Sequence, residues 1–291
     1  MSVRSQLAGT GVALVTPFAA DGSVDFEALG RLIDHVIKGG VNYLVTLGTT
    51  GEVAVLEEAE QLAAIDFTYQ AAGKLPVVVG IGGNNTQSLI KKLQTYPLDK
   101  AVAVLSASPY YSKPSQQGIF EHYKALAAAS PKPIILYNVP GRTASNLTAE
   151  TTLRLAQVPN IAGIKEASGN MVQCMHILNN RPADFLVTSG DDHLTLPLIA
   201  CGMDGVISVT ANCFPQTFAQ MVQHCLQGDF AAARPLHYQC LEANDLLFAE
   251  NNPAGAKAFL SEMGIIQNVL RLPLVPLSEG VHQRVKNNLK K

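Results

Sequence analysis

The chain has 291 residues, of which 47% are hydrophobic and 15% are charged, and its formal net charge is −2. This composition predicts a folded protein with a sizeable core, in one large domain or two small ones, and excludes a disordered chain. The near-neutral balance gives no reason to expect nucleic acid or an anionic membrane as a partner. The apolar runs are strand-sized and residues 1–17 lack the pattern of a secretion signal, so we expect a cytoplasmic protein without a membrane span. The five cysteines form no CxxC pair, and we interpret them as reduced packing residues.

Short apolar runs, typical of buried parallel strands, alternate with helical patterns from residue 11 to about residue 224. The expected strands are Gly11–Val15, Tyr43–Leu47, Val77–Gly80, Ala101–Ser106, Ile134–Tyr137, Ile161–Lys165, Phe185–Ser189 and Gly205–Ser208. The expected helices are Phe26–Lys38, Glu57–Ala72, Thr86–Thr95, Gln117–Ala129, Thr148–Ala156, Met171–Asn179, Asp192–Ala200 and Pro215–Leu226. Eight uninterrupted βα units favour a (β/α)8 TIM barrel over an open doubly wound sheet.

The pattern changes after Gly228, where helices follow one another without strands between them. The expected helices of this tail are Phe230–Phe248, Pro253–Met263 and Ser278–Leu289. We therefore expect a barrel that carries the active site in residues 1–227, and a C-terminal helical appendage or small domain in residues 228–291.

Lys165 ends the sixth expected strand, and a buried strand should not end on an ammonium group unless the amine is used. The carboxyl ends of barrel strands carry the chemistry in this fold. Apolar surroundings favour the neutral amine, which can attack a carbonyl and form a Schiff base. The alternative is a structural pair with Glu166, which strand alternation disfavours because neighbouring side chains point to opposite faces.

Tyr137 ends the fifth expected strand, and its phenol could move protons during imine formation; it could equally be a rim residue with its hydroxyl in water. The segment Gly48–Glu52 (GTTGE) follows the second strand. Its paired glycines, its hydroxyls and its backbone amides suit a carboxylate or phosphate, although an ordinary βα turn would look similar. It is not a P-loop, because no Gly-Lys-Ser/Thr follows.

Two further loops contain binding candidates. Arg142 follows Tyr137 in the segment Pro140–Thr143 and could hold a carboxylate through a two-point contact, or lie free on the surface. Ser108–Pro114 (SPYYSKP) presents two tyrosines, which suits either a site or a subunit contact. His193 has no second histidine at ligand spacing, so we expect no metal site.

Five segments, taken together and in order, resemble the dihydrodipicolinate synthase family of pyruvate-dependent class I aldolases. They are Gly48–Glu52 (GTTGE), Ser108–Pro114 (SPYYSKP), Tyr137–Thr143 (YNVPGRT), Ile164–Gly169 (IKEASG) and Gly205–Val209 (GVISV). The resemblance covers the barrel and the helical tail. It implies condensation of pyruvate with L-aspartate 4-semialdehyde to 4-hydroxytetrahydrodipicolinate, on the diaminopimelate route to lysine. It implies no cofactor beyond a covalent pyruvate imine.

The resemblance also implies roles for individual residues. Lys165 would form the imine, Thr49 and Thr50 would hold the pyruvate carboxylate, and Tyr137, Thr50 and Tyr111 would form a proton relay. The family takes Tyr111 from a neighbouring subunit, so the resemblance implies a homo-oligomer, which we expect to be a tetramer built as a dimer of dimers.

Three more substrate contacts follow from the resemblance. Arg142 would bind the carboxylate of the semialdehyde, Ile207 would line the pocket through its backbone, and Gly190 would also contribute to substrate binding. The nearest rival activity is that of N-acetylneuraminate lyase, against which Thr50 and Arg142 argue. A rival of another class is a non-catalytic ligand-binding barrel, against which the retained lysine, tyrosine and hydroxyl groups argue.

Inhibition by lysine is doubtful. The positions that correspond to the allosteric serine, two histidines and glutamate of lysine-inhibited members are Val53, Glu58, Gln61 and Ser88. Asn84 and Tyr110 are retained. An apolar valine cannot replace the serine's hydrogen bond, and Ser88 cannot pair with an ammonium group. We therefore expect weak feedback control.

Overall fold

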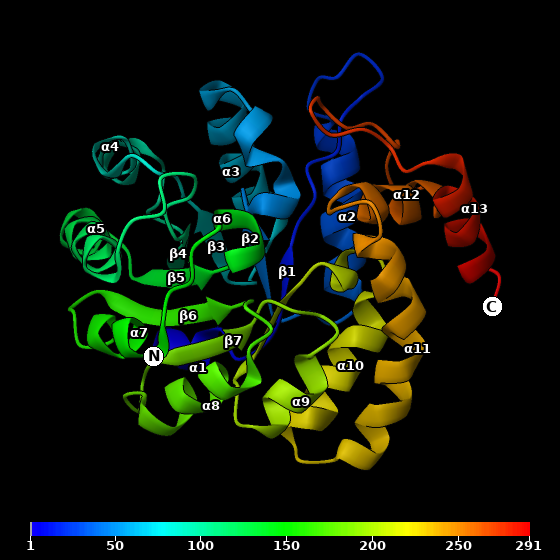
Figure 1. Ribbon diagram of the computed structural model, residues 1–291. Helices are drawn as coiled ribbons and strands as arrows, with labels where there is room; N and C mark the ends of the chain where they lie inside the picture. The colour runs from blue at the N-terminus through cyan, green and yellow to red at the C-terminus, as the bar shows by residue number, and fades with distance from the viewer. Residues whose placement is uncertain (1) are drawn as a thin grey trace.

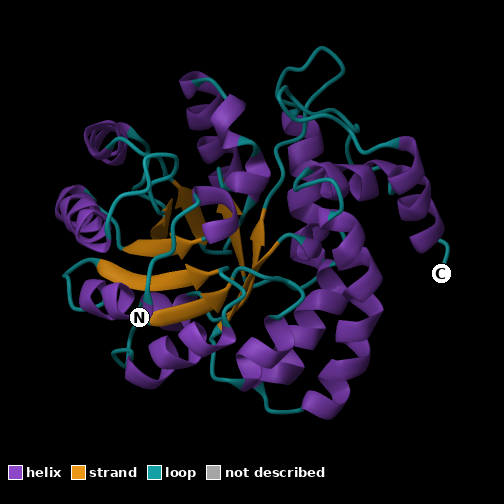
Figure 2. Ribbon diagram, in the orientation of Figure 1, coloured by secondary structure: helices purple, strands orange, loops and turns teal. Residues whose placement is uncertain are grey.

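The computed structural model describes residues 2–291 and forms a closed barrel of eight parallel strands surrounded by helices (Figures 1 and 2). The strands are β1 (Gly9–Ala13), β2 (Tyr43–Thr46), β3 (Val77–Gly80), β4 (Ala103–Ala107), β5 (Ile134–Asn138), β6 (Ile161–Glu166), β7 (Leu186–Ser189) and β8 (Gly205–Ser208). Neighbours in sequence pair in order, and β8 closes the barrel against β1. The predicted fold class is confirmed.

Two predicted strands begin two residues away from the observed first residue. β1 begins at Gly9 and ends at Ala13, because the N–H of Val15 donates to the Asn212 side chain at 3.2 Å and not to a strand neighbour. β4 begins at Ala103, since Ala101 belongs to the turn that precedes it. Apolar residues continue on both sides of these boundaries, so hydrophobicity alone could not place them.

The helices between strands follow the predicted order. They are α2 (Phe26–Lys38), α3 (Glu58–Ala71), α4 (Thr86–Thr95), α5 (Gln116–Ala129), α7 (Ala149–Leu155), α8 (Met171–Asn180), α9 (Thr195–Ala200) and α10 (Pro215–Leu226). The sequence pattern missed the short elements α1 (Val3–Gln6), η1 (Thr49–Gly51), η2 (Val53–Val55), α6 (Pro140–Thr143) and η3 (Thr210–Asn212).

Helix α9 is shorter than the predicted Asp192–Ala200. The Asp192 carboxylate accepts hydrogen bonds from the N–H groups of Val209 and Thr210, at 2.9 and 3.0 Å, and does not cap the helix. Asp192 therefore ties the start of α9 to the end of β8. Burial raises the pKa of this carboxyl above its usual value.

Buried side chains form two layers, as expected for parallel strands that are covered on both faces. One layer fills the barrel interior and includes Tyr43, Val78, Ile135 and Leu186, and Leu7 after α1 packs into it. The other layer lies between the strands and the surrounding helices. Because the interior is filled, a ligand can bind only at the end of the barrel where the strands terminate.

Three helices follow the barrel, α11 (Phe230–Phe248), α12 (Ala254–Glu262) and α13 (Glu279–Asn288), and they lie together on one side of it (Figure 1). Helix α11 packs along α10. The segment between α11 and α12 reaches the carboxyl ends of the strands, where its Asn252 contacts Thr50. Within residues 2–291, no helix combines the length and the apolar character that a membrane span requires.

Candidate active site

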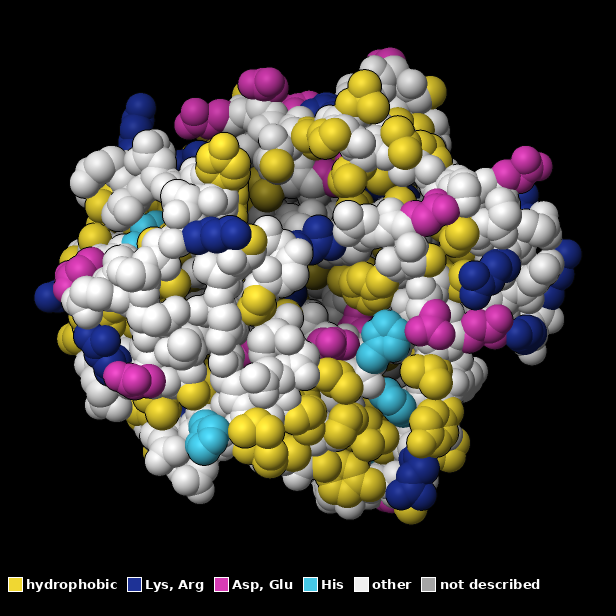
Figure 3. Space-filling model, viewed as in Figure 1, with side chains coloured by type: hydrophobic (Ala, Val, Ile, Leu, Met, Phe, Trp, Pro, Cys, Tyr) yellow, Lys and Arg dark blue, Asp and Glu magenta, His cyan; other side chains and the backbone are white. Residues whose placement is uncertain are grey.

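A cavity of about 650 Å³ opens at the carboxyl ends of the strands, and Figure 3 shows this hollow with basic side chains inside it. Its walls include residues of β1, β2, β4, β5 and β6 and of the loops that follow β2 and β7. The C-terminal segment completes the wall with Phe248, Asn251 and Asn252. The volume suits a small molecule or two.

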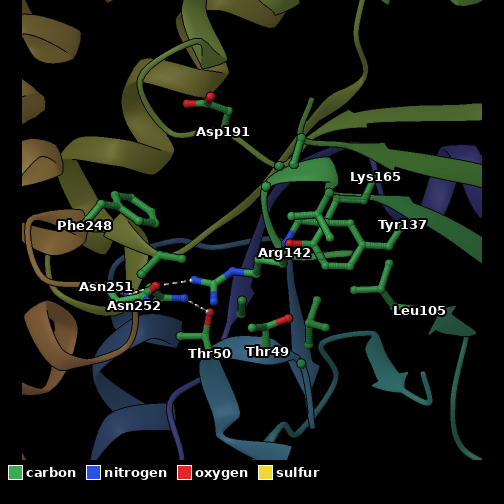
Figure 4. Close-up of a pocket in the computed structure, with 18 of the residues that line it drawn as sticks. Thr49, Thr50, Leu105, Tyr137, Arg142, Lys165, Asp191, Phe248, Asn251 and Asn252 are labelled. Atoms are coloured by element: carbon green, nitrogen blue, oxygen red, sulfur yellow. Dashed lines mark hydrogen bonds between the residues drawn. The ribbon is translucent and has the colours of Figure 1, made fainter. Parts of the chain in front are cut away.

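Lys165 and Tyr137 lie side by side in this cavity (Figure 4). They are register partners on β6 and β5, and the Lys165 Nζ lies 4.4 Å from the centroid of the Tyr137 ring. Lys165 is 5% exposed and Tyr137 is 8% exposed, so the face of the tyrosine ring helps to shield a buried amine from solvent. A sheltered amine beside a phenol has the groups that imine formation needs, a nucleophile and a proton donor.

Glu166 points to the opposite face of β6 and does not pair with Lys165. Its carboxylate accepts from both Asn138 Nδ2, at 3.0 and 3.2 Å, and Gln173 Nε2, at 3.1 Å. The N–H of Ser168 donates to it at 2.7 Å. The prediction from strand alternation is confirmed: among the described residues, Glu166 forms no ion pair with Lys165.

The turn after β2 brings two hydroxyl groups to the cavity. Thr49 and Thr50 belong to η1, and both line the cavity, with Thr49 exposed and Thr50 buried. The Asn252 Nδ2 donates to Thr50 Oγ1 at 2.9 Å (Figure 4). Since this hydroxyl oxygen already accepts a hydrogen bond, its own proton remains available for a group in the cavity.

Arg142 lies at the mouth of the cavity on the short helix α6, which begins with Pro140. Its guanidinium donates to Asn251 Oδ1 at 3.2 Å (Figure 4). This single neutral contact leaves most of the guanidinium donors for a ligand. The cavity therefore has a lysine at its base and an arginine at its mouth, a distribution that suits anionic substrates.

Gly190 follows β7 and lies against the lysine side chain. A Cβ placed on Gly190 would lie 2.8 Å from Lys165 Cε and 2.7 Å from Ala167 Cβ, so no larger residue fits without displacing them. The N–H of Gly190 donates to the Glu166 carbonyl at 2.8 Å. Gly190 thus forms part of the cavity wall and packs against the Lys165 side chain.

A family model described as the dihydrodipicolinate synthetase family matches residues 6–291. The chain belongs to this family. A protein of Parabacteroides distasonis named 4-hydroxy-tetrahydrodipicolinate synthase is 50% identical over 286 residues, which cover 98% of this chain and 96% of that protein. The family predicted from the five motifs is therefore confirmed.

Solved structures agree along almost the whole chain. A chloride-inhibited dihydrodipicolinate synthase from Acinetobacter baumannii, complexed with pyruvate, is 39% identical with a TM-score of 0.95, and 98% of each chain is covered. A structure described as the first monomeric dihydrodipicolinate synthase variant is 37% identical with a TM-score of 0.95, covering 99% of this chain and 98% of that one. With the sequence matches, these relatives confirm the predicted function and its class, a Schiff-base-forming lyase.

Two residues assigned from the dihydrodipicolinate synthase resemblance lie outside the cavity wall of this chain. Tyr111 is 88% exposed on the loop after β4 and has a left-handed backbone with φ of 71°. Ile207 is buried in β8, among the side chains of the barrel interior. By contrast, the structure brings together Lys165, Tyr137, Thr49, Thr50, Arg142 and Gly190.

Several lining residues were not predicted as site residues. Asp191 and His193 follow Gly190, and Phe248 lies 6.0 Å from His193 between ring centroids. The His193 side chain contacts the Asp245 carboxylate of α11 at 3.0 Å, which links the loop after β7 to the C-terminal helices. The place of Asp191 just after a strand was a usable signal, whereas no local signal marks Phe248.

Proposed function

We propose that this chain is a 4-hydroxy-tetrahydrodipicolinate synthase, which condenses pyruvate with L-aspartate 4-semialdehyde through an imine on Lys165. The observation that carries the proposal is the sheltered Lys165 amine, 4.4 Å from the centroid of the Tyr137 ring, beside the hydroxyl turn. Full-length similarity to proteins named for this activity supports the choice of substrates.

The first half of the proposed reaction activates pyruvate. The Lys165 amine attacks the C2 carbonyl, and loss of water from the carbinolamine gives the imine. Thr49 and Thr50 hold the pyruvate carboxylate, while Tyr137 supplies the proton that leaves with the hydroxyl and later accepts protons. The imine withdraws electrons from C3, so loss of a C3 proton gives an enamine, and the proposal requires no metal or organic cofactor.

The second half joins the carbons. The enamine C3 attacks the aldehyde carbon of the semialdehyde, whose carboxylate Arg142 binds at the cavity mouth. The substrate amine then attacks C2 and displaces Lys165, which closes the ring and frees the enzyme. Tyr137, Thr50 and the Tyr111 of a neighbouring subunit form the proton relay, and Gly190 forms the wall behind the lysine.

The assembly is part of the proposal. An 88% exposed tyrosine on a loop suits donation to a second copy, so we propose a homo-oligomer in the cytoplasm, a tetramer built from two dimers. Sedimentation equilibrium of the purified protein should give the mass of a dimer or tetramer at assay concentrations. A fully active monomer would contradict the shared relay.

Borohydride trapping tests the chemistry. Protein incubated with pyruvate and reduced should gain one pyruvate-derived adduct, and peptide mapping should place it on Lys165. Lys165→Ala should lose the adduct and nearly all turnover while remaining folded, and Lys165→Arg should behave alike because a guanidinium stays protonated. A folded wild type without an adduct at saturating pyruvate would favour a ligand-binding barrel. Cleavage of N-acetylneuraminate in place of the condensation would favour the rival lyase.

A further inference from the structure

The turn that carries Thr50 ends in an ion pair that is closed to solvent. Glu52 follows η1 with φ of 52° and ψ of 33°, a left-handed conformation that is unusual for a residue with a side chain. Its carboxylate lies 2.5 Å from the Nζ of Lys257 on α12, and both side chains are 0% exposed. The backbone N–H of Glu52 bonds the Thr49 carbonyl at 3.1 Å, so carboxylate and turn move together.

Both members of this pair make further contacts. The Lys257 Nζ donates to the Val269 carbonyl at 2.9 Å and lies 3.9 Å from the centroid of the Phe18 ring. The second carboxylate oxygen of Glu52 accepts from the N–H of Arg271 at 3.3 Å. Burial lowers the pKa of Lys257 to about 8, and the adjacent Glu52 opposes that decrease. The pair is therefore held in one geometry.

A second connection between Lys257 and Thr50, besides the ion pair with Glu52, runs through the segment that precedes α12. The N–H of Lys257 donates to the Pro253 carbonyl at 3.0 Å, which places Lys257 one helical turn beyond Pro253, the residue after Asn252. Asn252 in turn donates to Thr50 Oγ1 at 2.9 Å. Helix α12 and the segment before it therefore hold the turn at two points. Asn252 donates a hydrogen bond to the Thr50 hydroxyl, and Lys257 pairs with Glu52, two residues after Thr50.

We propose that Glu52 and Lys257 are positioning residues of the active site, whose buried ion pair fixes the turn after β2 and thereby the Thr50 hydroxyl in the cavity. Desolvation makes a buried pair a poor source of stability, so its geometric constraint is the more informative property. The inference rests on the proposed role of Thr50. It gives the C-terminal helices a part in the chemistry, although neither residue touches the cavity.

The test compares three changes, Lys257→Met, Glu52→Gln and the double variant Glu52→Gln/Lys257→Met, each alone and combined with Thr50→Val. We expect Lys257→Met to lower kcat about 10- to 100-fold, the usual effect of a misplaced catalytic group, while pyruvate is still trapped on Lys165. Thr50→Val should cost much less in these backgrounds than in the wild type, because the hydroxyl is already misplaced. The double variant should recover part of the loss, since it leaves no unpaired carboxylate.

The matched control is Glu262→Gln. Glu262 lies on α12, like Lys257, but pairs with His282 and Lys286 of α13. Within residues 2–291, these ion pairs include neither Arg271 nor Glu52. The control variant should lower the melting temperature and leave kcat unchanged. If Lys257→Met does not fold, the double variant decides, because it buries no unpaired charge.

The proposal would be overturned if Thr50→Val lowered kcat by the same factor in the pair variants as in the wild type. A kcat within twofold of the wild type in the folded pair variants would also overturn it. Absence of a pyruvate adduct on wild-type Lys165 would overturn the proposed function, and this inference with it. An adduct in the wild type with no coupling to Thr50 would overturn the positioning role alone.

Discussion

Gly190 and Lys165 lie so close that a Cβ on the glycine would come within 2.8 Å of the lysine Cε. The glycine is needed here for space, since its φ is not among the positive values that favour glycine. The absence of a side chain after β7 therefore determines where the amine of β6 can lie.

Gly190→Ala should slow imine formation by about 10-fold or more, because the methyl group must push the lysine from its place. Overpacking should also cost about 1–3 kcal/mol of stability. Rapid-quench trapping with borohydride measures the rate at which the pyruvate adduct forms, and thermal unfolding measures the change in stability. Gly141→Ala is the matched control, since Gly141 lines the same cavity and a Cβ there would meet nothing within 4 Å. Equal rates in the two variants would contradict the steric argument.

Local patterns in the sequence were sufficient for the barrel and for placing Lys165, Tyr137 and the Thr49–Thr50 turn at strand ends, because each lies at the end of a strand that its own residues define. Their assignment to one site came from the resemblance, since an isolated rim tyrosine or βα turn has the same local pattern. The C-terminal contribution could not be found this way. Asn252 bonds a residue 202 positions away, and Lys257 stands in a helical pattern where a lysine is ordinarily solvated. Its complete burial arises only when α12 packs on the barrel.

Arg142→Ala should weaken the reaction with aspartate semialdehyde far more than the binding of pyruvate. The guanidinium lies at the cavity mouth, and within residues 2–291 it donates one hydrogen bond, to Asn251. Loss of a charge-assisted carboxylate contact should cost roughly 1.5–3 kcal/mol, or about 10- to 150-fold in kcat/KM for the semialdehyde. Steady-state kinetics with each substrate varied in turn measure this. A comparable loss for both substrates would indicate a general structural role.

Tyr111→Phe should lower turnover with little change in pyruvate binding, because the phenol acts in proton transfer and not in holding the substrate. If a partner donates it, mixed dimers of Tyr111→Phe and Lys165→Ala subunits should regain activity, since one site of the hybrid has both groups. Subunit exchange is verified by native mass spectrometry with one isotopically labelled partner. Hybrids that form without regaining activity would place Tyr111 in its own chain's site.

His122 should make the fold sensitive to acid. It is 7% exposed, contacts Thr86 Oγ1 at 2.8 Å, and burial lowers its pKa to about 4. The unfolded chain, with a pKa near 6.5, binds the proton first, so stability is complete above about pH 6.5 and is lost as pH falls toward 4. The loss from this group should reach about 3 kcal/mol.

His122→Asn keeps an acceptor near Thr86 but cannot titrate, so its unfolding free energy should fall less between pH 6.5 and 4 than that of the wild type. Urea unfolding at intervals of half a pH unit measures the difference. His176→Asn, at an exposed position on α8, serves as the control and should follow the wild type. Parallel curves for all three proteins would mean that His122 is protonated without cost.

The residues that would meet a bound lysine effector are otherwise engaged in this chain. Gln61 is buried, its Nε2 donates to the Leu56 carbonyl at 2.8 Å, and its Oε1 accepts from Tyr96 at 2.7 Å. The Lys92 ammonium also reaches that oxygen, at 3.2 Å. Ser88 is exposed on α4 and contributes no carboxylate. An effector ammonium group placed here would lie near the Lys92 ammonium, and the Gln61 amide that could accept its hydrogen bond is already bonded to Tyr96 and Lys92.

L-Lysine should therefore inhibit weakly, if at all. Asn84 donates to the Tyr110 carbonyl at 3.4 Å, so the two retained positions are adjacent, but Val53 cannot donate a hydrogen bond to an effector carboxylate. Loss of one charged contact, about 1.5–3 kcal/mol, weakens binding about 10- to 150-fold, which moves a sub-millimolar effector to millimolar concentrations or above. A coupled assay of the condensation of pyruvate with aspartate semialdehyde, titrated with lysine at fixed pyruvate, measures this inhibition directly. Half-inhibition at sub-millimolar lysine would require Glu58, or another group, to pair with the ammonium from a different direction.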